Sequence, residues 1–120
     1  EARATLVGIG GTVRPVSLAL TGALAQSWLE HLSFDVAVVG CSGIQTDRGP
    51  ATAELSDAAL KAEVLRRARQ RILVAHAGKW GQSSTLVYAP WKTFTSVVTD
   101  HILTIDQKSQ LAAAGVGLPK

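Results

Sequence analysis

Short apolar runs separated by a helical pattern constrain the fold of this chain more than any other feature. "VAVV" (36–39) and "ILVA" (72–75) contain only aliphatic residues. Such runs are typical of strands in a parallel sheet that is buried on both faces. Between them, Leu60, Val64 and Leu65 recur at helical spacing. A strand, a helix and a strand in this order predict a β-α-β unit, and therefore an α/β fold whose mostly parallel sheet is flanked by helices.

Further segments extend this pattern toward both ends of the chain. Residues 5–9 have the composition of a short buried strand, and residues 85–89 and 96–99 that of two more. Leu20, Leu24, Trp28 and Leu32 recur every four residues, which predicts a helix with Trp28 in the core. A small helix is expected over residues 105–114, with Gly115 ending it.

The segment between the two central strands divides into a loop and a helix. Residues 41–52 contain Gly43, Gly49 and Pro50, which favours a loop. Ser56 is the expected N-cap of the helix that follows, with Asp57 in its first turn, where the helix dipole favours a negative charge.

The bulk composition limits the class of protein. The chain has 120 residues, a formal net charge of +3 and a pI near 9.4, which suits one mildly basic domain. Its densest basic cluster, residues 66–71, is better explained by a solvated helix face than by a nucleic-acid footprint. Cys41 is the only cysteine, so we expect a reducing, cytoplasmic location. We expect no membrane partner, metal or cofactor, because no apolar run approaches membrane length and no phosphate-loop or dinucleotide fingerprint occurs.

Four loops deserve inspection as a ligand site, because ligands of such sheets bind beyond the carboxyl ends of the strands. Each loop follows a predicted strand, and parallel strands would bring all four to one edge of the sheet. They are residues 10–15, 40–52, 76–81 and 99–101.

Several residues in these loops suit an anionic ligand. Gly10 and Gly11 would let backbone amides approach it, and Arg14 would bind a phosphate through its guanidinium, although taken alone these residues are better explained by a tight turn with a surface arginine. Ser42 and Gly43 offer a hydrogen-bond donor and space, or a simple chain reversal.

The remaining candidates are charged or titratable. Lys79, between Gly78 and Gly81, suits a phosphate or a sugar carboxylate, and otherwise is a solvated loop lysine. Asp57 and Lys61 are four residues apart, which favours an intrahelical ion pair; alternatively, Asp57 reaches the pocket and holds sugar hydroxyls. We prefer His76 as a capping or packed residue. A triad of Ser42, His76 and Asp100 stays open, although no G-x-S-x-G elbow surrounds a serine.

Five segments together resemble the effector-sensing domain of DeoR-family transcriptional repressors. "GIGGTVRP" is similar to the family's Gly-Gly-x-x-Arg segment, with Ser17-Leu18 and Gly22 after it, and "FDVAVVGCSGI" to its strand ending in Gly-x-x-Gly-Ile. Asp57, Ala58 and Lys61 match its acidic-Ala-x-x-Lys helix, "HAGKWG" its Asp-x-x-Lys-Phe-Gly motif and "VVTD" its Thr-Asp strand end. The chain departs from the family at His76, which replaces the acidic residue, and at Trp80, which replaces Phe. Ala51 occupies the place of a family threonine, with Thr52 one residue later.

The resemblance implies a Rossmann-like fold related to ribose-5-phosphate isomerase and glucosamine-6-phosphate deaminase. Residues 1–120 would be the second half of an effector-binding domain. The winged helix-turn-helix and the first half, with its phosphate loop, would lie outside the chain, which opens in a strand pattern with no initiator Met. The expected partners are a phosphorylated sugar or related metabolite, DNA only through the helix-turn-helix, and further copies of the chain.

The resemblance also implies roles for the candidate residues. Lys79 would neutralise the phosphate with help from Arg14, while Gly10, Gly11 and Gly43 would admit backbone amides. Effector binding would then change DNA binding without catalysis. Two alternatives stay open: a sugar-phosphate isomerase or deaminase, which needs a carboxylate base such as Glu54, Asp57 or Asp100, and a plain interaction domain.

Overall fold

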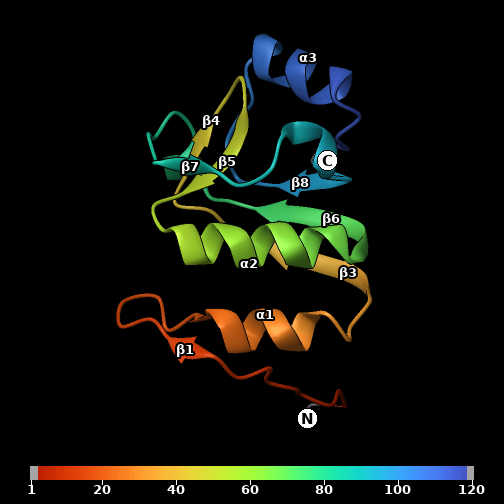
Figure 1. Ribbon diagram of the computed structural model, residues 1–120. Coiled ribbons are helices and arrows are strands. Elements are labelled where there is room, and N and C mark those ends of the chain that lie inside the picture. The colour runs from red at the N-terminus through yellow and green to blue at the C-terminus, as the bar shows by residue number, and fades with distance from the viewer. Residues whose placement is uncertain (1–2, 119–120) are drawn as a thin grey trace.

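A computed structural model describes residues 3–118, and its centre is a three-stranded parallel sheet (Figure 1). The strands are β3 (Phe34–Val39), β6 (Ala68–Val74) and β8 (Ser96–Val98), in the order β3-β6-β8. Val38 pairs with Ile72, and Val74 pairs with Val98. The predicted parallel pairing is therefore confirmed, and the strand expected at residues 72–75 begins earlier, at Ala68.

Helix α2 (Leu55–Arg66) connects the two central strands and covers one face of the sheet. Its buried Ala58 and Leu65 join a core that includes Ala37 and Leu73. Asp57 lies in the first turn as predicted, but the N-cap is Glu54, so the assignment of Ser56 as the cap is wrong. The extended backbone already ends at Glu54, which has φ −121° and ψ 136°, and the helix starts at the next residue.

The segment predicted as a loop over residues 41–52 instead forms two strands, which corrects that prediction. β4 (Gly43–Gln45) and β5 (Gly49–Thr52) form an antiparallel hairpin, and β7 (Leu86–Val87) pairs with β5 on the other side. The glycines that suggested a loop are required because other backbone segments pack closely against them. A Cβ on Gly49, whose φ is +137°, would lie 2.5 Å from the Ala89 carbonyl oxygen.

The N-terminal part departs most from expectation. Residues 5–9 form no strand, and Leu6 is 98% exposed. A two-stranded ribbon follows, β1 (Thr12–Val13) and β2 (Leu20–Thr21), and then helix α1 (Ala23–Leu29). A strand needs a partner for its backbone groups, and residues 5–9 have none in the described chain.

The helix face predicted for α1 is also wrong. Trp28 is 53% exposed rather than in the core, and the buried residues are Ala25 and Leu29. The reason is that α1 packs against α2 and β2, through the face that carries the small Ala25, and not against a sheet layer.

The C-terminal part closes the core above the sheet. It contains the short 3-10 helices η1 (Ala77–Lys79) and η2 (Trp91–Thr93) and then α3 (Ile105–Ala113). Thr104 and Gln107 form a capping box at the start of α3, and Gly115 follows its end with φ +80°, as the predicted helix requires. In the described part of the chain, no helix has the length and apolar character needed to cross a membrane.

Candidate functional site

The carboxyl ends of the three parallel strands lie at one edge of the sheet, which we call the carboxyl edge. Hydrogen bonds join the loops there. Ala75 N donates to Val98 O at 3.0 Å, and Ala77 N donates to Asp100 Oδ1 at 2.6 Å. Gly81 N also donates to Ile44 O at 3.1 Å, so three of the four loops predicted as a ligand site meet. The fourth, residues 10–15, does not follow a strand, contrary to the expectation for it.

A buried carboxylate lies beside this edge, at the start of α2. Oδ2 of Asp57 accepts a hydrogen bond from Thr52 Oγ1 at 2.8 Å. The same oxygen forms an ion pair with Lys61 Nζ at 3.0 Å. Burial raises the pKa of Asp57, but the Thr52 and Lys61 hydrogen bonds and the charges of Lys61 and Arg14 outweigh it, so the pKa lies below its ordinary value. These contacts favour the charged form of Asp57, and the predicted pair with Lys61 is present.

Lys61 also connects this carboxylate to the loop after β3. Its ammonium lies 5.3 Å from the ring centroid of Tyr88, whose hydroxyl donates to Gly40 O at 2.8 Å. Burial raises the pKa of Cys41, and the positive charges of Lys61 and Lys79 offset part of that rise. Lys79 lies in η1, and the adjacent Trp80 forms a bridge with Ile44 of β4.

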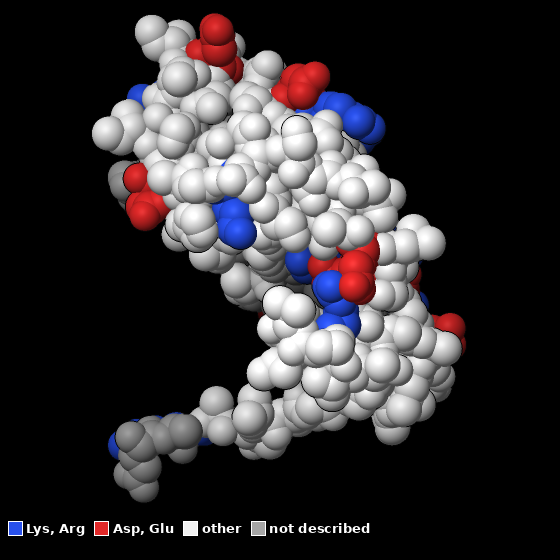
Figure 2. All heavy atoms as spheres, turned by 90° about the vertical axis from the view of Figure 1, so that its left-hand side faces the viewer, with Lys and Arg blue, Asp and Glu red and all other residues white. Residues whose placement is uncertain are grey.

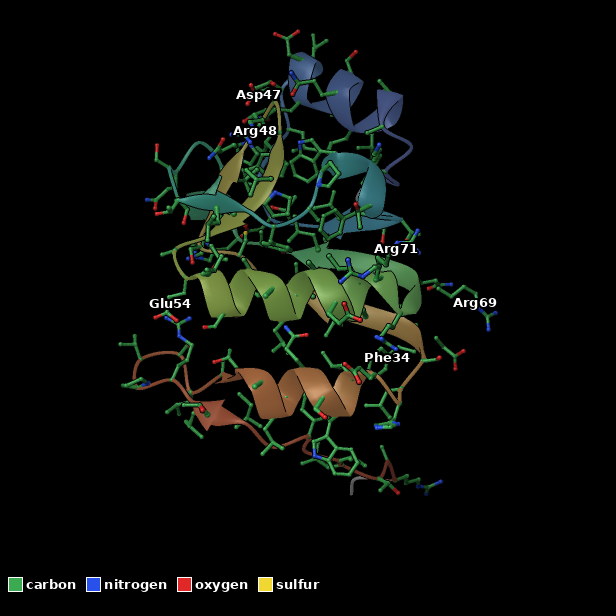
Figure 3. All side chains as sticks on the ribbon, viewed as in Figure 1. Phe34, Asp47, Arg48, Glu54, Arg69 and Arg71 are labelled. Carbon is green, nitrogen blue, oxygen red and sulfur yellow. The ribbon has the colours of Figure 1, made fainter. Side chains whose placement is uncertain are left out.

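Arg14 reaches α2 from the turn between β1 and β2. Its Nη2 lies 2.5 Å from Glu54 Oε1, and its charge contributes to the lowered pKa of Asp57. Figure 3 shows Glu54 at the end of α2 nearest the carboxyl edge, pointing toward that turn. Figure 2 looks onto this side of the molecule, where acidic and basic side chains gather between the main body and the N-terminal part.

The predicted glycines are explained first by packing. A Cβ on Gly43 would lie 2.5 Å from the Gln82 carbonyl oxygen, because β4 passes close to the loop after η1. A Cβ on Gly11, whose φ is +120°, would lie 2.9 Å from Thr21 O, and Gly10 has φ +76° beside Leu24. Gly43 therefore belongs to the carboxyl edge, while Gly10 and Gly11 pack on β2 and α1.

The structure does not assemble the triad of Ser42, His76 and Asp100. Nδ1 of His76 accepts a hydrogen bond from Gly78 N at 3.0 Å, which is the capping role we preferred. Asp100 accepts from Ala77 N instead of orienting the imidazole. Ser42 is exposed, and its backbone N–H donates to Ala51 O.

Two residues that contact Asp57 or Lys61 were not predicted as site residues from the sequence, namely Thr52 and Tyr88. Of the two residues between which the family's threonine was ambiguous, Ala51 is fully buried, whereas Thr52 binds Asp57. The signal for Thr52 was a hydroxyl residue just before a helix with an acidic first turn. Among residues 3–118, no group of three or more His, Cys, Asp or Glu side chains is placed to hold a metal ion.

A comparison with protein families decides the class of this domain. The family described as the DeoR C-terminal sensor domain matches residues 1–101. The chain belongs to the DeoR C-terminal sensor-domain family. The resemblance inferred from the five sequence segments is therefore confirmed.

Similar full-length proteins are transcriptional regulators. The chain is 30% identical over 107 residues to the HTH-type transcriptional regulator GlpR of Haloferax volcanii, covering 89% of this chain and 42% of that protein. It is 30% identical over 96 residues to the regulator YgbI of Escherichia coli, covering 80% and 37%, and 26% identical over 112 residues to FruR of Bacillus subtilis, covering 92% and 45%. The DeoR sensor domain described here thus spans less than half the length of the curated relatives it matches.

Proposed function

We propose that this DeoR sensor domain binds a phosphorylated sugar, or a related metabolite, at the carboxyl edge, and that binding alters the DNA affinity of a helix-turn-helix outside the chain. The observation that carries the proposal is that the loops after β3 and β6 meet at this edge beside a buried charged pair. Gly81 N donates to Ile44 O at 3.1 Å, so the turn that carries Lys79 packs against β4. Lys61 binds the buried Asp57, which also accepts a hydrogen bond from Thr52. A cationic rim beside a fixed carboxylate suits a ligand with a phosphate at one end and hydroxyls at the other.

The roles follow from which charges are already neutralised. Asp57 balances Lys61, and Glu54 balances Arg14, whereas Lys79 takes part in none of the ion pairs found among residues 3–118. We assign the phosphate to Lys79, supported by Arg14, and the sugar hydroxyls to Asp57 and Lys61.

Ser42 and the predicted glycines would leave space for the ligand to approach the backbone. Ser42, exposed just after β3, would donate a hydrogen bond, and the backbone at Gly43 would line the rim, while Gly10 and Gly11 would shape the turn that presents Arg14. The parallel sheet supports a Rossmann-like fold of the ribose-5-phosphate isomerase and glucosamine-6-phosphate deaminase type, of which this chain would be the second part.

The carboxylates favour sensing over catalysis. An isomerase or deaminase needs a base that is free to take a proton from its substrate. Each of the three carboxylates suggested by the sequence is engaged: Asp57 by Thr52 and Lys61, Glu54 by Arg14, and Asp100 by Ala77 N. The regulators among the relatives support the same assignment.

Thermal unfolding of the full-length regulator with a panel of sugar phosphates, each paired with its unphosphorylated sugar, tests the proposal. A ligand that binds only the native state adds about 2.7 kcal/mol of stability when its concentration is a hundred times its Kd. The melting temperature rises as a result. We expect a shift with at least one sugar phosphate, none with its parent sugar, and no turnover. Turnover of the ligand would establish the enzyme instead, and no shift with any phosphorylated sugar would leave a plain interaction domain.

A further inference from the structure

The turn that carries Lys79 has little structure of its own to hold it in place. η1 is three residues long, and none of them is buried. At its start, Ala77 N donates to Asp100 Oδ1 at 2.6 Å. Just after its end, Gly81 N donates to Ile44 O at 3.1 Å. Segments with few buried contacts open locally, so the position of Lys79 depends on what anchors the turn from outside.

Trp80 is such an anchor, because it follows Lys79 directly and packs against the hydrophobic core. Its backbone forms a bridge with Ile44 of β4. Its indole Nε1 donates a hydrogen bond to Thr99 Oγ1 at 3.1 Å, in the loop after β8. One residue therefore joins the Lys79 turn both to β4 and to the loop after β8.

The ring of Trp80 is stacked against two other rings. The ring centroids of Trp80 and Trp91 lie 5.8 Å apart, with an interplanar angle of 16°. Those of Trp80 and His101 lie 5.1 Å apart, with an angle of 21°. Offset stacking is a favourable arrangement of aromatic rings, so it fixes the plane of the indole and keeps its N–H directed at Thr99.

His101 is itself held at two points. Its backbone N–H donates to Thr99 Oγ1 at 3.1 Å, the same oxygen that accepts from Trp80. Its Nε2 lies 3.1 Å from Gln107 Oε1, which also accepts from Thr104 N at 2.8 Å. Because a backbone N–H only donates, the Gln107 atom is an oxygen, and His101 Nε2 must carry the proton. The capping box of α3 therefore holds the imidazole against which Trp80 stacks.

The indole hydrogen bond distinguishes this chain from the family motif. Trp80 stands where the motif has Phe, and a Phe ring packs in a core but has no N–H to donate. The contact with the Thr99 hydroxyl is therefore an addition to the packing that an aromatic residue alone provides.

We propose that Trp80 is a positioning residue of the effector site, which fixes the Lys79 turn through its indole hydrogen bond to Thr99 and thereby raises the affinity for a sugar phosphate. This inference rests on the proposed function, which assigns the phosphate to Lys79. Trp80 acts without touching the ligand. Because the turn is ordered beforehand, binding does not lose affinity to the ordering of Lys79.

Four variants of the full-length regulator separate the hydrogen bond from core packing. Trp80→Phe removes the indole donor and Thr99→Val removes the hydroxyl acceptor, whereas Thr99→Ser keeps the hydroxyl. Trp91→Phe is the matched control, because it removes a stacked indole whose Nε1 donates to Thr46 O at 2.8 Å, outside the Lys79 turn. Amide hydrogen exchange over residues 76–82, measured without any effector, reports the opening of the turn.

We expect the amides of the turn to exchange about three- to tenfold faster in Trp80→Phe and in Thr99→Val, because one hydrogen bond is lost. Thr99→Ser and Trp91→Phe should exchange like the parent. The double variant, Trp80→Phe with Thr99→Val, should exchange no faster than the faster single variant, since both changes remove the same bond. Parental exchange in either Trp80→Phe or Thr99→Val would overturn the inference, and so would equal acceleration in Thr99→Ser or Trp91→Phe.

Isothermal titration with the sugar phosphate that stabilises the regulator tests the link to the effector. Its Kd should rise about three- to tenfold in Trp80→Phe and Thr99→Val, and stay unchanged in Thr99→Ser and Trp91→Phe. Parental affinity in Trp80→Phe, together with lost binding in Lys79→Ala, would refute this inference alone. Retained binding in Lys79→Ala, or a regulator that no sugar phosphate stabilises, would refute the proposed function and the positioning role with it.

Discussion

The Thr52 hydroxyl donates a 2.8 Å hydrogen bond to Oδ2 of Asp57, and both residues are buried. Thr52 ends β5 and Asp57 lies in the first turn of α2, so this bond fixes the helix start to the antiparallel hairpin. Lys61 shares the same carboxylate oxygen at 3.0 Å. This charged group beside the carboxyl edge is therefore held in place by contacts within the domain.

Replacing Asp57 by Asn tests this anchor through stability. The amide leaves Lys61 without a counter-charge, so we expect a loss of about 1–3 kcal/mol in the free energy of unfolding at neutral pH. Because the folded-state pKa of Asp57 lies below its ordinary value of 3.8, the stability contributed by its charge is fully present above that value and is lost as the pH falls through the folded-state pKa. Urea unfolding from neutral to acidic pH measures both effects.

Asp106→Asn is the matched control for this change. Asp106 also lies in the first turn of a helix, but it is exposed on α3. We expect its loss to stay within about 0.5 kcal/mol. An Asp57→Asn deficit that is the same at every pH would show that the charge is not the stabilising feature.

Replacing Gly43 by Ala tests the close approach of β4 to the loop after η1. The new Cβ would lie 2.5 Å from the Gln82 carbonyl oxygen, so the backbone must move. We expect about 1–3 kcal/mol of destabilisation. Gly8→Ala is the control, because its Cβ would meet nothing within 4 Å, and thermal unfolding should not distinguish it from the parent chain. A neutral Gly43→Ala would mean that the two segments are further apart than described.

Replacing Arg14 by Ala separates ligand binding from stability. The ion pair with Glu54 is partly exposed, and such pairs contribute only about 0–1 kcal/mol. If Arg14 assists a phosphate, its loss should weaken effector binding by about tenfold or more, since hydrogen bonds to charged groups are worth about 1.5–3 kcal/mol. Isothermal titration of the full-length regulator gives the affinity.

Arg66→Ala is the appropriate comparison for Arg14. Arg66 pairs with Glu63 at the other end of α2, far along the helix from Glu54. It should leave the affinity unchanged. Equal affinities for the Arg14 and Arg66 variants would remove Arg14 from the site.

The sheet and its central helix were predictable because their signals are local. The aliphatic run at β3 and the spacing of Leu60, Val64 and Leu65 in α2 depend on the sequence within each element. The N-terminal part was not predictable in this way. Leu6 and Trp28 follow strand and helix patterns, yet their burial depends on partners that lie elsewhere, and the described chain supplies none.

The candidate site was predictable in its outline only. Strand order alone brings the loops after β3, β6 and β8 to one edge, and helical spacing brings Asp57 to Lys61. Thr52 was ambiguous because its contact with Asp57 depends on the β4–β5 hairpin, and the sequence around Gly49 and Pro50 predicted a loop there instead. Glycines at 11 and 43 suggested ligand contact, whereas backbone packing is sufficient to require them.

Lys79 provides the most direct test of the account. Isothermal titration of the full-length regulator with the sugar phosphate that stabilises it should give no detectable binding to Lys79→Ala. Arg69→Ala should bind like the parent, because Arg69 lies at the opposite end of β6 (Figure 3) and pairs with the exposed Asp35. Undiminished binding to Lys79→Ala would contradict the claim that this edge of the sheet holds the phosphate.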